Sequence, residues 1–187
     1  MRWPVFLVFA LLALVLDRSL IGALEFNGVQ PLSVATVAVF VALMAPKMTA
    51  LWACWMLGLM VDLGSPMASD GAVHIIGPHA LGFAFGGYLV VLIRSMVFRR
   101  RALTIGVMTV ACMLAVSLIV VVVLVIRSWF EATTGAWPMD SATRALGHRF
   151  FVALYSGIIA LPIGWMLVRT MPLWGFQSKT SRPVNWR

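Results

Sequence analysis

The chain contains few charged residues. Lys and Arg number 14 and Asp and Glu only 6 among 187 residues, so 11% of the chain is charged and 62% is hydrophobic. Soluble domains average roughly 25% charged and about 45–50% apolar residues. A water-soluble core of this size cannot hide so much apolar surface, and the apolar runs are continuous rather than alternating. The composition therefore predicts an all-α integral membrane protein.

Cysteine and recognisable catalytic motifs are also scarce. Cys54 and Cys112 each lie in an apolar run without a CxxC pair, and we interpret both as small buried side chains. The sequence has no GxSxG, no HExxH and no phosphate-binding glycine loop. Nothing in the spacing of Ser156 and Gly157 to a histidine supports a hydrolase. We expect neither an enzyme nor a cofactor.

Six apolar stretches, separated by turn-forming or charged segments, predict six transmembrane helices. The clearest is 102–126, which carries no charge and exceeds the roughly twenty residues that cross a bilayer. We expect the first stretch to be retained rather than cleaved, and a short interfacial helix to begin at Ser141. The predicted spans are 3–22, 32–45, 48–63, 78–98, 102–126 and 150–168, in one domain over 1–170 that is followed by a loosely ordered basic tail, 171–187.

The basic residues predict that both termini are cytoplasmic. With six spans in that orientation, the basic residues of the inside segments outnumber those of the outside segments, as the positive-inside rule requires. The net charge of +8 is therefore a topology signal, and we expect no nucleic-acid partner. The inside residues are Arg2, Lys47, Arg94, Arg99, Arg100, Arg101, Arg169, Lys179, Arg182 and Arg187, and the outside residues are Arg18, Arg127, Arg144 and Arg149.

Tryptophans fall mainly near the predicted span ends or in polar flanks, which is typical of an interfacial belt. Trp52 and Trp55 lie within the third span, and we interpret them as packing residues. The predicted belt comprises Trp3, Trp129, Trp137, Trp174 and Trp186.

Most of the unusual residues gather between Gly58 and Tyr88. Gly58 and Asp62 are four residues apart and share a helix face. We expect Asp62 to hydrogen-bond the start of the following loop or to pair with an arginine; a proton or ion site and an anchor for a partner remain open. Gly82 and Gly86 form a small-xxx-small pair, which favours internal helix packing or, as a second choice, a partner interface.

Asp70, His74 and His79 fall on the predicted outer side and have side chains that zinc accepts. Breaks at Gly71 and Gly77 spoil any helical ligand spacing, and no third strong ligand is near. We therefore interpret these side chains as polar surface groups and expect no metal. Pro78 is well placed for the first turn of the fourth helix.

A short set of motifs carries a family resemblance. It comprises Gly58-x-x-x-Asp62-Leu63, a glycine-containing loop, Gly77-x-x-Ala80-Leu81, Tyr88-Leu89 and a basic cluster after the fourth span. Between about Pro31 and Met108 the chain resembles the MreD family of bacterial rod shape-determining membrane proteins. The loop between Asp62 and Gly77 and the segment 127–149 are longer than the family pattern.

The resemblance implies a non-catalytic part of the cell-elongation machinery in the bacterial inner membrane. Its expected partners are an MreC-like single-span protein and, directly or indirectly, a RodA-type glycosyltransferase with a class B penicillin-binding transpeptidase, and MreB filaments. The family also resembles in fold the S components of energy-coupling-factor transporters, which makes a vitamin-binding subunit the alternative. The scaffold predicts an exposed small-residue groove near Gly58, Gly82 and Gly86. The alternative predicts an outward pocket lined by Asp62, His74, His79 and Tyr88.

Overall fold

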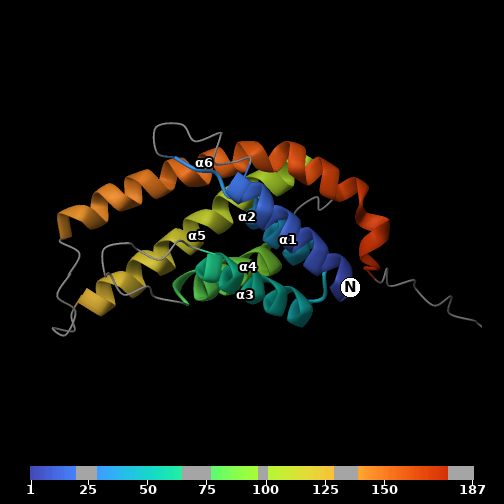
Figure 1. Ribbon diagram of the computed structural model, residues 1–187, viewed down its shortest axis with the longest axis horizontal. Coiled ribbons are helices and arrows are strands. Elements are labelled where there is room, and N and C mark those ends of the chain that lie inside the picture. Colours follow the sequence, from blue (N-terminus) through green and yellow to red (C-terminus); the bar gives the residue numbers. More distant parts are fainter. Residues whose placement is uncertain (20–28, 65–76, 97–100, 129–138, 177–187) are drawn as a thin grey trace, which may run out of the picture.

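The computed structural model describes residues 1–19, 29–64, 77–96, 101–128 and 139–176, and this part of the chain is all-helical (Figure 1). The described elements pack around one another along their lengths, and the N-terminus lies beside the end of the last helix. In chain order they are α1 (Trp3–Ser19), α2 (Ser33–Met44), α3 (Lys47–Gly64), α4 (Pro78–Ile93), α5 (Ala102–Ser128), α6 (Met139–Arg169) and the 3₁₀ helix η2 (Met171–Trp174).

The six predicted helical stretches correspond to these six helices, with differences at some boundaries. Helix α4 ends at Ile93, before the predicted limit of 98. Helix α6 begins at Met139, so the separate interfacial helix predicted from Ser141 is wrong: it is the first part of a continuous helix that runs through 150. Five of the eight residues from 142 to 149 are Ala, Leu or Arg, which favour helix, and no proline interrupts the segment.

Two helices are long and apolar enough to cross a membrane among the described residues. They are the segment Ala102–Ile126 of α5 and the segment Gly147–Arg169 of α6. Helices α2 and α4 are apolar but shorter. At 1.5 Å per residue, the 12 residues of α2 extend roughly 18 Å, less than the hydrocarbon core of about 30 Å.

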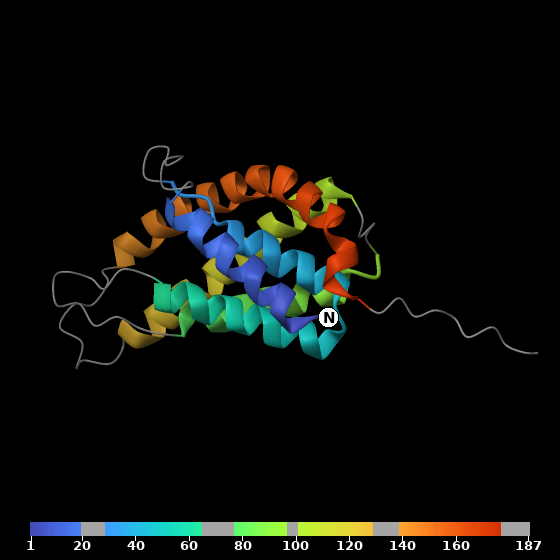
Figure 2. The same ribbon diagram turned by 45° about the vertical axis from the view of Figure 1, so that its right-hand side comes forward.

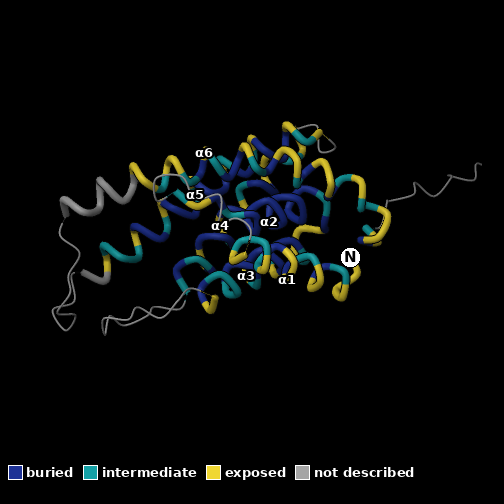
Figure 3. Tube along the Cα trace, turned by 45° about the horizontal axis from the view of Figure 1, so that its top comes forward, coloured by how far each residue is buried: buried dark blue, intermediate teal, exposed yellow. Residues whose placement is uncertain are grey.

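Helix α2 lies at the centre of the protein. It contacts α1, α3, α4, α5 and α6, and eleven of its twelve residues are buried. Figure 2 shows it between α6 on one side and α3 and α4 on the other, and Figure 3 shows the buried centre. A helix that is apolar on every side belongs inside a protein or lipid, and the sequence Ser-Val-Ala-Thr-Val-Ala-Val-Phe-Val-Ala-Leu-Met fits this position.

Side chains from other helices satisfy the backbone groups at the N-terminal end of α2. Asp17 of α1 accepts hydrogen bonds from the backbone N–H groups of Ser33 (2.7 Å) and Val34 (3.1 Å). Ser156 of α6 accepts one from Leu32 N–H (2.9 Å) and donates its hydroxyl to Val152 O. The first N–H groups of a helix have no partner within it, so these residues remove the cost of burying that end.

A guanidinium group binds the other end of α2. Arg94, just after α4, donates hydrogen bonds from Nη1 to the carbonyl oxygens of Ala42 and Ala45. These carbonyls belong to the last turn of α2 and to the residue after it. The macrodipole of α2 thus meets a carboxylate at its positive end and a cation at its negative end, and both contacts stabilise it.

Two tryptophan sites need comment. Trp52 and Trp55, interpreted as packing residues, pack edge-to-face on each other, but they do so on the outer surface, where Trp52 is 61% exposed. Trp174 was expected in an interfacial belt, yet it is fully buried. Helix periodicity explains the first difference, because α3 turns the side that bears Ala50, Ala53 and Leu57 inward.

The start of the predicted tail is folded. The ring of Trp174 lies 4.9 Å from Phe9 and 5.1 Å from Phe40 between centroids, and it stacks on Phe176. Its carbonyl accepts a hydrogen bond from Arg2 N–H. The expected loose tail therefore cannot begin at 171; aromatic burial holds the chain against α1 and α2 as far as Phe176.

Arg94→Met should lower the free energy of unfolding by roughly 1.5–3 kcal/mol, because hydrogen bonds to a charged group would be lost and two carbonyls left without that donor. The matched control Arg18→Met removes an exposed arginine and should change the free energy by less than about 0.5 kcal/mol. Denaturant titration of the purified protein in one detergent measures both. Equal effects would contradict the assigned role of Arg94.

Candidate functional site

The carboxylate of Asp62 binds the N-terminal end of α4. Asp62 is only 2% exposed and lies near the end of α3. Its Oδ2 accepts hydrogen bonds from Gly77 N–H (2.9 Å) and Ala80 N–H (3.1 Å), and its Oδ1 accepts one from His79 N–H (3.3 Å). A carboxylate on one helix thus serves as the cap of the next helix, where the dipole favours a negative charge.

The imidazole of His79 completes this arrangement. Its Nδ1 lies 2.7 Å from Asp62 Oδ1. An ionised carboxylate only accepts hydrogen bonds, so this contact places a proton on Nδ1 and leaves Nε2 as the second ring nitrogen. Asp62 therefore fixes both the tautomer and the orientation of a half-buried histidine.

Two glycines make this connection between α3 and α4 possible. A Cβ on Gly58 would lie 2.5 Å from His79 O and 2.6 Å from Ala80 Cα, so only glycine permits the backbones to approach so closely. Gly77 has φ +128°, a backbone conformation that side chains with a Cβ rarely adopt. Pro78 follows it in the first turn of α4, as predicted.

The glycines of α4 face inward rather than into an exposed groove. A Cβ on Gly82 would meet Val116 of α5, and one on Gly86 would meet Cys112 of α5. Gly87 makes the same close approach to Cys54 of α3. The structure thus assigns the small residues to packing of α4 against α3 and α5, and it does not place Gly58, Gly82 and Gly86 on an open surface.

The remaining candidate residues do not join this site. Tyr88 points outward and is 44% exposed. Asp70 and His74 lie outside the described residues. Both cysteines are free and buried, and no group of three His, Cys, Asp or Glu side chains within the described ranges could hold a metal ion.

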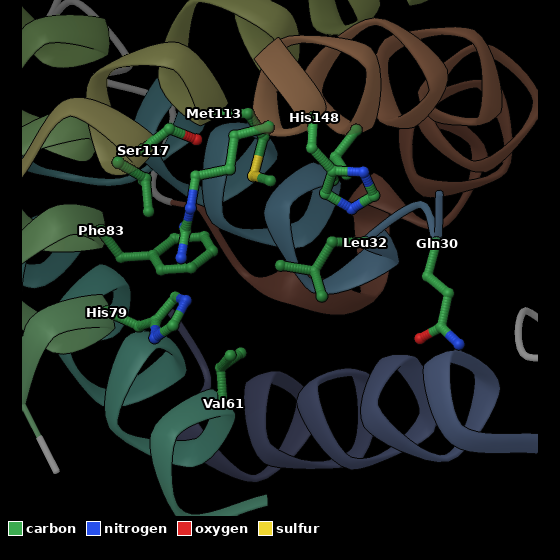
Figure 4. Close-up of a pocket in the computed structure, with 11 residues that line it drawn as sticks. Gln30, Leu32, Val61, His79, Phe83, Met113, Ser117 and His148 are labelled. Atoms are coloured by element: carbon green, nitrogen blue, oxygen red, sulfur yellow. The ribbon is translucent and has the colours of Figure 1, made fainter. Parts of the chain in front are cut away.

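A cavity of about 310 Å³ opens beside His79 (Figure 4). Five segments contribute to it: the chain before α2, then α3, α4, α5 and α6. Gln30 and His148 are exposed at its mouth, whereas Phe83, Val116 and Ser117 are buried at its floor. Its lining residues are Gln30, Leu32, Val61, His79, Phe83, Met113, Val116, Ser117, His148, Arg149 and Val152.

The sequence alone did not predict the roles of several residues that hold helix ends or line the cavity. Asp17 was expected near an interface but caps α2, and Ser156, rejected as a nucleophile, holds the same helix end. His148 and Arg149 were not linked to His79, because only the fold brings α6 beside α4. The sequence did contain one signal for the capping role: an aspartate at the end of an apolar helix needs hydrogen-bond donors within the protein.

Helices α5 and α6 also approach closely at glycines that the sequence analysis left aside. A Cβ on Gly106 would lie 3.1 Å from Gly157 O, and one on Gly157 would clash with Val110. Glycines seven residues apart, at 157 and 164, could have indicated this contact.

Comparison with known proteins adds no relative: no family, no curated protein and no solved structure matches the chain.

Asp62→Asn should destabilise the protein by about 2–3 kcal/mol, because an NH₂ group would face backbone donors that now bind a carboxylate. Asp17→Asn, which disturbs fewer backbone N–H groups, should cost less. Denaturant titration of both variants compares them under one condition. An Asp62 effect no larger than that of Asp17 would show that the α4 cap is not the stronger of the two.

Gly58→Ala should lower the free energy of unfolding by about 1–3 kcal/mol, because the added methyl group would push α3 and α4 apart. Gly147→Ala is the matched control: it lies in α6 with nothing within 4 Å of the new Cβ, and alanine should stabilise that helix by roughly 0.5–1 kcal/mol. Thermal unfolding of both variants shows whether each substitution stabilises or destabilises the protein. A neutral Gly58→Ala would contradict the close approach.

Proposed function

We propose that this chain is a non-catalytic membrane scaffold of bacterial cell-wall elongation. In this proposal it crosses the inner membrane six times with both termini in the cytoplasm, binds an MreC-like single-span protein, and influences a RodA-type glycosyltransferase, a class B penicillin-binding transpeptidase and MreB filaments. The resemblance between Pro31 and Met108 supplies the partners.

One surface feature carries the proposal. Leu81, Phe85, Tyr88 and Leu92 are all exposed on α4, at intervals of four, three and four residues. This spacing places them on one face of the helix. A row of side chains with this spacing is the one against which a second helix packs in a left-handed pair with a small crossing angle. A single-span partner offers such a helix.

Tyr88 distinguishes this face from an ordinary lipid-facing one. Its hydroxyl has no hydrogen-bond partner among the described residues, although it lies inside an apolar helix. In the proposed six-span arrangement this face of α4 borders lipid, and a hydroxyl without a partner in an apolar medium costs several kcal/mol. Helix α1 also exposes an apolar face, which includes Trp3, Leu7 and Leu11, but its one aromatic side chain lies at the start of the helix, where tryptophan commonly lies at a membrane interface.

The interior supports a scaffold rather than an enzyme. The buried acid Asp62 and the buried hydroxyl of Ser156 both hold helix ends, as the Asp17 carboxylate does. Groups engaged in this way keep the helices in one arrangement and have little freedom to act on a substrate.

A second candidate is a small-molecule-binding subunit similar to the S components of energy-coupling-factor transporters. The cavity beside His79 favours it, because several polar side chains converge there over an apolar floor. Tyr88, which that alternative expected in the pocket, is outside it.

Leu81→Ala with Phe85→Ala, and separately Tyr88→Phe, should reduce co-purification with an MreC-like single-span protein at least several-fold, because the first pair removes packing area and the second removes only the hydroxyl. Affinity capture in mild detergent, with the partner quantified by mass spectrometry, measures the retained fraction.

Leu7→Ala with Leu11→Ala is the matched control on α1 and should retain the partner. If the α4 variants and the α1 control all lose the partner, the substitutions have destabilised the protein in general. If every variant retains the partner, the interface is not on α4. A chain that ignores the partner and retains a vitamin-sized ligand would favour the second candidate.

A further inference from the structure

The cavity beside His79 contains two polar groups that no described residue binds. Ser117 of α5 is 4% exposed, and its hydroxyl has no hydrogen-bond partner within the described part of the chain. Most helical serines inside a protein donate to the carbonyl four residues earlier, as Ser156 does. A serine hydroxyl that lines a cavity without such a bond can donate to or accept from a ligand.

Arg149 of α6 is the second such group. Its side chain is only partly exposed, lines the cavity, and forms no ion pair or hydrogen bond with any residue that the structure describes. A guanidinium group is always charged and carries five donors. Because no described residue supplies a counter-ion to this partly buried group, an anion in the cavity would be stabilised.

Two imidazoles flank the same space. His79 of α4 and His148 of α6 line the cavity together with the buried Ser117 of α5 (Figure 4). Because Asp62 binds Nδ1 of His79, the other nitrogen of that ring remains for a ligand. The carboxylates of Asp62 and Asp17 are engaged by the ends of α4 and α2 and do not line the cavity.

The floor of the cavity is apolar. Phe83, Met113 and Val116 are buried there. A volume of about 310 Å³ corresponds to roughly ten water molecules and lies at the lower end of the range for small-ligand pockets.

We propose that this cavity binds an anionic group, a carboxylate or a phosphate, attached to a small apolar body. Arg149 and the imidazoles of His79 and His148 bind the anion, Ser117 contacts its inner edge, and the apolar body lies against Phe83. A soluble organic acid and the headgroup region of an anionic lipid both have this chemistry. The inference does not depend on the scaffold function, which uses the outer face of α4.

The test uses the full chain in phosphatidylcholine nanodiscs with 4-fluorobenzoate as the probe, titrated by fluorine NMR. Arg149→Gln should weaken its binding roughly tenfold or more, because charge-assisted hydrogen bonds are lost. Arg169→Gln is the matched control on the same helix, since Arg169 stacks on Trp165 and does not line the cavity. The neutral probe 4-fluorobenzyl alcohol should bind the unaltered protein at least tenfold more weakly.

A second arm distinguishes the two sources of the anion. Native mass spectrometry of protein from nanodiscs that contain phosphatidylglycerol should show one retained lipid if a lipid fills the site, and that lipid should be lost in Arg149→Gln but not in Arg169→Gln. Retention of 4-fluorobenzoate without retention of the lipid would assign a soluble acid.

Ser117→Ala keeps the test decisive if Arg149→Gln does not fold. It removes only a hydroxyl and should weaken binding of the anionic probe about two- to tenfold with an unchanged unfolding temperature. Binding that is equal in these variants and in Arg169→Gln, or absent from the unaltered protein in both arms, would overturn the proposal. Either result leaves the α4 partner experiment unaffected, so the two failures are distinguishable.

Discussion

The buried position of α2 is the constraint on which the rest of this structure depends. A short helix enclosed by five others cannot bring its ends to water, so its unpaired N–H and carbonyl groups need partners within the protein. Asp17 and Ser156 provide them at one end and Arg94 at the other. These three side chains come from α1, α6 and the residue after α4, so satisfying one helix fixes the positions of three others.

The connection between α3 and α4 repeats the same principle. Asp62 accepts from the first backbone N–H groups of α4, as Asp17 accepts from those of α2. In both cases an aspartate near the end of one helix binds the start of the next. Both aspartates in the apolar segments therefore have a structural role: each binds the backbone N–H groups at the start of a helix. Among the described residues that line the cavity, Arg149 and Ser117 have no such role in holding a helix end.

The sequence predicted the number, order and approximate limits of the helices, because apolar runs and turn residues mark them directly. It failed where tertiary packing decides. Nothing local distinguishes Trp174, which is fully buried, from Trp52, which is 61% exposed. The spacing of Gly58 and Asp62 placed them on one face, but only the fold shows that His79 bridges this face to a cavity shared with α6. His79 and His148 line one cavity although they are 69 positions apart in the sequence, and no periodicity links residues so far apart.

The glycines of α4 show a further limit of motif reasoning in apolar helices. A small-xxx-small pair indicates that another backbone approaches, but it does not say whether that backbone belongs to the same chain. Here α5 packs against Gly82 and Gly86, so the proposed scaffold function requires a partner to bind through large side chains on the opposite face. Large apolar side chains in lipid give little preference for protein over acyl chains, because both are equally apolar. A polar group among them restores that preference, and on this face the hydroxyl of Tyr88 is the group that lipid tails cannot satisfy.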